Sequence, residues 1–130
     1  MPFKAIQPPN IFKSPAPYSP ATRTEGGAML HISGQVAQDS DGRNIGVGDI
    51  RSQADQVVRN IKTIVESQGA TLADICRITI FLTAREYLPV VMEVRRRYFQ
   101  EPYPAATAVI VSGLAHPEWL VEIEATAVLP

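Results

Sequence analysis

The sequence has few of the side chains that most often bind metals or perform acid–base chemistry. It contains two histidines, His31 and His116, and one cysteine, Cys76. These numbers exclude Cys₄, Cys₂His₂ and His₃ zinc sites within one chain. One cysteine cannot form an intrachain disulfide, which suits a reducing compartment. If the protein is an enzyme, it works without the common metal sites.

The sequence also lacks a strong charge of either sign and any long apolar run. Lys and Arg number 12 and Asp and Glu 13, which weighs against nucleic acid or an anionic membrane as a partner. No segment approaches the roughly 18 apolar residues of a membrane span, and the first residues lack the apolar core of a signal peptide. The eight glycines form no nucleotide-binding fingerprint. We expect a soluble, cytoplasmic protein with a single domain over residues 1–130.

Proline is abundant only at the start of the chain. Six of the 11 prolines lie within residues 1–20, which excludes a helix or a central strand there. Two interpretations remain open for this segment. It is either a surface arm with a short edge strand near Phe3–Ile6, or a set of rigid turns that holds Tyr18 and Ser19 in a fixed place.

The hydrophobic pattern predicts two helices and several strands. Apolar residues recur at three- and four-residue steps over 49–68, with Asp49 as N-cap and Gly69 as C-cap. Period-two alternation predicts a strand at 28–35, for which Ala21–Thr24 is a candidate hairpin partner. The expected order is strands at 3–6, 21–24 and 28–35, a helix at 49–68, a strand at 75–82, a helix from about 86 to 99, and strands at 105–112 and 119–128. This order predicts an α+β fold in which one mixed sheet of about six strands has two helices packed on one face.

The last strand has the most informative pattern. Trp119, Val121 and Ile123 lie on an apolar face, and Glu122 and Glu124 lie on the other. Carboxylates about 7 Å apart on one face raise each other's pKa, and such a group can act as a general acid or base. The alternative is a solvated polar face on an edge strand, and the pattern alone leaves both open.

Other reactive residues have simpler interpretations. Ser33 shares a strand face with His31, but no G-x-S-x-G elbow surrounds it, so a serine-hydrolase triad is not favoured. The run Arg95–Arg97 spreads around its helix and indicates a solvated face or an oligomer contact. Cys76 falls on the apolar face shared by Ile78, Ile80 and Leu82, which favours a buried, inert thiol.

Several short segments, in their order and spacing, resemble the Rid (YjgF-type) imine-deaminase family. The resemblance covers residues 12 to 128. Its segments are Pro17-Tyr18-Ser19, Ile32-Ser33-Gly34-Gln35, the helix around Gln56 and Asn60, Tyr98-Phe99, Pro104-Ala105 and Val121-Glu122-Ile123-Glu124-Ala125.

The resemblance implies a chorismate-mutase-like fold and a homotrimer with small-molecule ligand sites in clefts between subunits. It implies hydrolysis of reactive enamines and imines to 2-oxo acids and ammonia, with no metal or organic cofactor. Glu122 matches the glutamate that helps a water attack the imine carbon. Tyr18 and Ser33 match residues of the family's pocket.

The sequence departs from the family pattern at the ligand site. Ala106 occupies the position of the family's carboxylate-binding arginine, and alanine offers no planar fork for a carboxylate. Met92 occupies the position of an asparagine in the second helix. The loop before the last strand is one residue longer and contributes His116 and Trp119. We therefore expect a more apolar cleft, lined by Ala106, Met92 and Trp119.

Three hypotheses follow. The first is an enzyme of the same reaction type acting on a substrate without the usual carboxylate anchor, with Glu122 activating water and Ser33 and Tyr18 holding the ligand. The second is a non-catalytic small-molecule binder or regulator on the same trimer. The third is a ribonuclease, which the near-zero charge and scattered arginines disfavour.

Overall fold

Two layers make up the main body, a sheet and a pair of helices. The computed structural model describes residues 3–130, so Pro2 of the proline-rich segment lies outside the described residues. The strands are β1 (Phe3–Ile6), β2 (Ala21–Thr24), β3 (Met29–Gln35), β4 (Ile75–Leu82), β5 (Ala105–Ile110) and β6 (Val121–Val128). The α-helices are α1 (Ile50–Glu66) and α2 (Leu88–Tyr98), and 3₁₀ turns occupy Leu72–Asp74 and Arg85–Tyr87. The predicted order of elements is confirmed.

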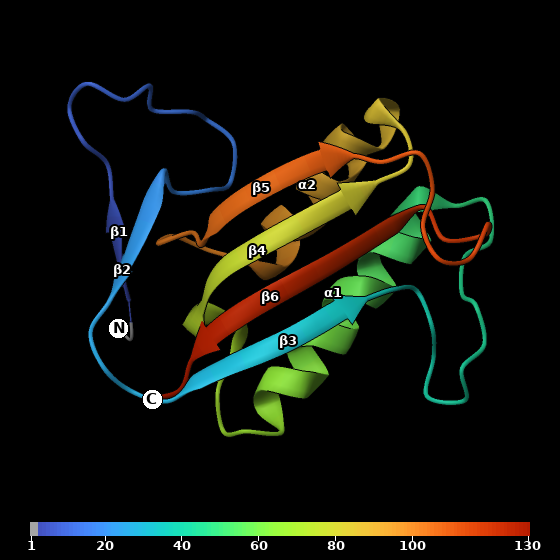
Figure 1. Cartoon of the computed structure of the whole chain (residues 1–130), viewed down its shortest axis with the longest axis horizontal. Coiled ribbons are helices and arrows are strands. Elements are labelled where there is room, and N and C mark those ends of the chain that lie inside the picture. The colour runs from blue at the N-terminus through green and yellow to red at the C-terminus, as the bar shows by residue number, and fades with distance from the viewer. Residues whose placement is uncertain (1–2) are drawn as a thin grey trace.

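The strands form two sheets instead of one. Four strands pair in the order β3-β6-β4-β5, and β1 pairs only with β2 in a hairpin beside one end of that sheet (Figure 1). β6 is antiparallel to both β3 and β4, while β4 and β5 are parallel. The predicted pairing of Ala21–Thr24 with the 28–35 strand is wrong, because β2 pairs with β1. Gly26 and Gly27 both adopt left-handed φ, of 70° and 85°, and lead the chain from β2 into β3 without pairing the two.

β6 is an inner strand. The alternative of a polar face on an edge strand is therefore wrong, because β3 and β4 flank β6 on its two sides. β6 also begins at Val121, so Trp119 belongs to the preceding loop and not to the strand. β5 is the edge strand that follows β4.

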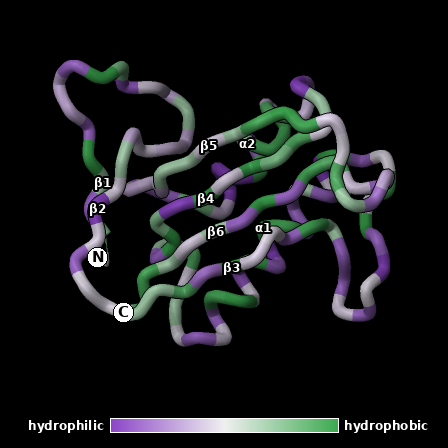
Figure 2. Tube along the Cα trace, viewed as in Figure 1, coloured by the Kyte–Doolittle hydropathy of each residue, from purple (hydrophilic) through white to green (hydrophobic). Residues whose placement is uncertain are grey.

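Both helices cover one face of the four-stranded sheet (Figure 1). The apolar stripe of α1, which includes Val57, Ile61 and Val65, packs on the core strands. Hydrophobic and hydrophilic residues alternate along β4 and β6, so each strand gives one apolar face to this core (Figure 2). Each fully buried Val or Ile favours the folded state by roughly 1.5–3 kcal/mol.

Cys76 lies apart from the main core. The pairing of β4 with β6 shifts between Ile75 and Arg77, so Cys76 does not share the face of Ile78. It packs instead in a second buried cluster with Phe3 and Val128, which joins the β1–β2 hairpin to the sheet. The thiol is buried, as predicted, and this burial raises its pKa.

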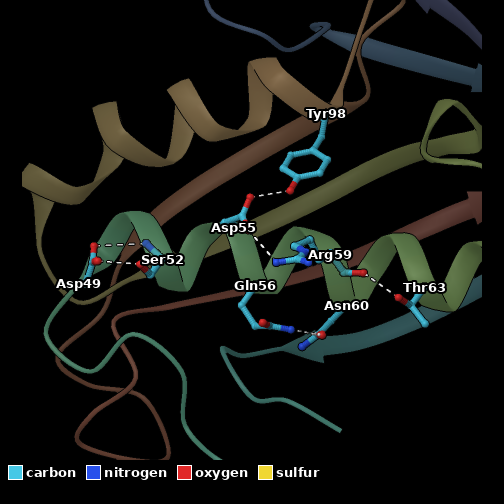
Figure 3. Close-up of polar contacts among 8 residues, drawn as sticks. All are labelled: Asp49, Ser52, Asp55, Gln56, Arg59, Asn60, Thr63 and Tyr98. Atoms are coloured by element: carbon cyan, nitrogen blue, oxygen red, sulfur yellow. Dashed lines mark hydrogen bonds and ion pairs between the residues drawn. The ribbon is translucent and has the colours of Figure 1, made fainter.

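Polar side chains define the ends and the attachment of α1. Asp49 caps its N-terminus by accepting hydrogen bonds from the backbone N–H groups of Arg51 and Ser52, as predicted. Gly69 adopts φ +75° two residues after the C-cap Ser67. In Figure 3 the Tyr98 hydroxyl at the end of α2 donates to Asp55 of α1 and ties the two helices together.

We predict that Asp49→Ala lowers the free energy of unfolding at neutral pH, whereas Asp49→Asn retains most of it. The hydrogen bond from the Ser52 hydroxyl, followed by its backbone N–H, lowers the pKa of Asp49 below 3.8. The carboxylate therefore stabilises the fold above that pH, and its contribution is lost as pH falls through the lowered pKa. Denaturant unfolding of the three proteins measures this. A gap between wild type and Asp49→Ala that is undiminished in acid would contradict it.

Candidate functional site

A bulge in β3 contains Gly34, whose backbone lies against the Glu122 side chain of β6. Ile32 pairs with Ala125 and Gln35 with Ile123, so Ser33 and Gly34 together oppose the single residue Glu124 of β6. A side chain on Gly34 would overlap with Glu122 Oε2 and come within 2.8 Å of its Cδ. The Glu122 carboxylate thus lies directly over the backbone of Gly34.

Glu122 lies on the face of the sheet away from the helices. It pairs with Phe81, whose neighbours Ile80 and Leu82 point into the core. Glu122 is half-buried, while Ser33 beside it is exposed. This arrangement offers a carboxylate and a hydroxyl to a small molecule on the open face.

Tyr18 and Ser19 lie at the other edge of the sheet, at the start of β5. The Ser19 N–H donates to the Pro104 carbonyl at 3.0 Å, its hydroxyl donates to the Tyr103 carbonyl, and it forms a bridge with Ala105. Ser19 is 8% exposed, so the interpretation of a held segment is confirmed for this residue. Tyr18 is 37% exposed and lines a cavity of about 590 Å³ together with residues of the arm and of the 101–103 turn.

Two arginines of α2 hold the same arm from the other side. Arg95 Nη2 donates to the Pro17 carbonyl at 2.8 Å, and Arg96 Nη2 donates to the Pro15 carbonyl at 3.2 Å. The expectation of a solvated run is wrong for Arg95, which is 4% exposed. It lies one turn after the buried Val91, on the stripe that faces inward. Burial, followed by the charge of Arg96, lowers the pKa of Arg95 to about 10.

Ala106 lies on the edge strand β5 and not near Glu122. Ala106 pairs with the core residue Ile78 and packs against the core, on the helix side of the sheet. Met92 is half-buried on α2. One chain therefore places Ser33 and Glu122 on the same open face, and it places Ala106 on the opposite face, two strands from Glu122.

Trp119 is tied into the loop before β6. Its indole N–H donates to Asn44 Oδ1 at 2.9 Å, and its ring lies 5.4 Å from that of His116. The buried Gln53 supports the same loop, because its amide donates to the Glu118 carbonyl and its oxygen accepts from the Leu120 N–H. Sequence reasoning missed Gln53, although a polar residue three positions from Ile50 on the apolar stripe was a signal.

Within residues 3–130, no three His, Cys, Asp or Glu side chains gather as metal ligands would. The helices of this range are also too short or too polar to cross a membrane.

The two helices packed on one face of a mixed sheet define a chorismate-mutase-like α+β protein. The sequence profile of the family described as Endoribonuclease L-PSP matches residues 9–129. A RutC family protein from Pyrococcus horikoshii is 40% identical over 91% of both chains. A 2-iminobutanoate/2-iminopropanoate deaminase from Dermatophagoides farinae is 31% identical over 98% of both. The crystal structure of YyfB, a conserved Rid family protein from Yersinia pestis, covers 99% of this chain and 100% of its own, with a TM-score of 0.93 and 34% identity.

These matches extend over nearly the whole chain, and the structural match is to a protein with the same fold. The chain belongs to the Rid (YjgF) family.

We predict that Gly34→Ala displaces the Glu122 carboxylate while leaving the fold intact. Gly34 has no left-handed φ, so alanine fits its backbone, and the atoms that the new methyl group meets belong to a flexible side chain. Gly113→Ala is the matched control, because a Cβ there meets nothing within 4 Å. Crystal structures and thermal unfolding of both variants measure the effect. An unmoved Glu122 in Gly34→Ala would contradict the close approach.

Proposed function

We propose that the protein hydrolyses a reactive imine or enamine at a cleft between subunits, with Glu122 positioning or activating the attacking water. The observation that supports this most is the half-buried Glu122 carboxylate over Gly34, on the open face where Ser33 is also exposed. Family membership and the deaminase relative support the reaction type. An imine carbon is already electrophilic, so a carboxylate and a water suffice for its attack.

The cleft we propose needs more than one copy of the chain. Glu122 and Ser33 lie on the open face, whereas Ala106 lies on β5, Tyr18 precedes Ser19 at the start of β5, and Met92 lies on α2. A second copy whose β5 edge meets the first copy's open face would unite them. The open face also exposes apolar side chains, Met29 at 46% and Val109 at 38%, which favours a covered surface. We infer a homotrimer with three such clefts, in which Trp119 borders the ligand.

We predict a trimer in solution at micromolar concentration. Light scattering measures its mass, which should be three times the 14.2 kDa of one chain. Thr79→Arg, in the middle of the open face beside Glu124, should weaken the assembly by placing a bulky charge within it. Arg43→Glu, an exposed charge change in the 38–44 loop, is the control. A monomeric wild type would remove the inter-subunit cleft.

We infer a non-standard substrate or a carboxylate that another residue binds, because Ala106 offers no fork for a carboxylate at β5. The assay therefore uses a panel of imines, generated in place by amino-acid and amine oxidases, and follows imine loss. We predict that wild type accelerates the loss of at least one imine. Glu122→Gln should lower this rate by about 100-fold, the scale of general acid–base catalysis.

Glu124→Gln is the matched control, because it removes a carboxylate from the same face of β6 and leaves the Glu122 carboxylate over Gly34 in place. An unaffected Glu122→Gln variant would disprove the role of the carboxylate. No acceleration of any imine would disprove the enzyme and leave the alternative of a non-catalytic ligand-binding trimer. Cleavage of RNA by wild type and not by Glu122→Gln would instead support the ribonuclease. If only Ala106→Arg hydrolyses 2-iminopropanoate, the fork alone separates this chain from that substrate.

A further inference from the structure

Arg95 is a buried charge without a complete set of partners. Its guanidinium makes one hydrogen bond to residues 3–130, from Nη2 to the Pro17 carbonyl. Nε is buried and has no partner, and it is the only such side-chain nitrogen or oxygen atom in that range. Nη1 also lacks a partner among these residues and is not a buried atom, so solvent reaches the guanidinium at Nη1.

No carboxylate of the described residues neutralises this guanidinium. The ion pairs of residues 3–130 use other arginines, such as Arg51 and Arg97 with Glu93. Arg96 beside it adds a like charge. A buried charge without a partner is unfavourable, and an added anion removes that cost. The observation therefore points to a negatively charged group that binds at this place.

The position of Arg95 coincides with the β5 edge of the candidate site. Its guanidinium bonds to the carbonyl of Pro17, the residue before Tyr18, and Ser19 then links the same arm to Pro104 and Ala105. Ala106, the next residue of β5, provides no charge. Arg95 is thus a buried cation that holds the arm one residue before Tyr18.

We propose that the guanidinium of Arg95 binds the carboxylate of the molecule that occupies the cleft. A planar carboxylate matches the fork of a guanidinium, and such charge-assisted bonds are strong where water is excluded. The inference rests on the proposed function in one respect, because the carboxylate is assigned to the imine substrate and its 2-oxo product. The acidic group then binds beside α2 and not on a β5 side chain.

The test is the binding of pyruvate and of its neutral analogue pyruvamide to the full-length, ¹⁵N-labelled protein. NMR follows the Nε–H signal of Arg95, which is identified by its absence in Arg95→Gln. We expect pyruvate to shift this signal and pyruvamide to leave it unchanged. Pyruvate should bind about tenfold more tightly than pyruvamide, the scale of a hydrogen bond to a charged group.

Arg95→Gln should reduce that preference to within about twofold, whereas Arg97→Gln, an exposed arginine of the same helix, should retain it. Arg95→Lys keeps the charge without the fork and should retain part of the preference. Absence of pyruvate binding, an equal loss in Arg97→Gln, or a carboxylate of a neighbouring subunit on Arg95 in a crystal would each overturn the proposal. Pyruvate binding requires no turnover. An inactive protein that binds pyruvate through Arg95 therefore disproves hydrolysis alone, and an active protein whose Arg95→Gln variant binds pyruvate normally disproves the anion site alone.

Discussion

The pairing of β6 with strands on both of its sides fixes the rest of the molecule. β3 and β4 bind its two edges, so its side chains can point only to the helices or to the open face. The inward residues Val121, Ile123 and Ala125 anchor the strand in the core. Glu122 therefore has one available direction, and the β3 bulge at Gly34 leaves the space that its carboxylate fills. A catalytic candidate is held here by backbone pairing and not by side-chain hydrogen bonds.

The same constraint separates the two halves of the candidate site. A strand face cannot be exchanged, so Ala106 on the helix side of β5 and Glu122 on the open face of β6 stay apart within one chain. The assembly of identical chains that we propose would bring Ala106 of one copy close to Glu122 of another. The proline-rich arm is also held in place. Hydrogen bonds of Arg95, Arg96 and Ser19 fix the segment that contains Tyr18.

The order of elements, the caps of α1 and the strand 75–82 were predictable, because local periodicity and capping chemistry determine them. The split into sheets of four and two strands was not, since pairing partners depend on contacts between distant segments such as Phe3 and Cys76. The order of short segments that resembles the Rid family identified Glu122, Tyr18 and Ser33 as candidate site residues. Two features of the sequence also indicate the roles of Gly34 and Arg95. Gly34 is a glycine inside a strand, and Arg95 lies at i+4 from Val91 on the apolar stripe of its helix.

The contacts that Arg95 makes within the described residues do not offset the cost of burying its charge. The C-terminal end of α2 contributes about 0.3–1 kcal/mol to a nearby cation, and its bond to Pro17 about 1.5–3 kcal/mol. Desolvation of a guanidinium costs several kcal/mol, and burial accordingly lowers the pKa of Arg95 to about 10. A tyrosine or glutamine could reach the same carbonyl without that cost. A negative charge beside the guanidinium would offset this desolvation, so the burial of Arg95 agrees with the proposal that a carboxylate binds there.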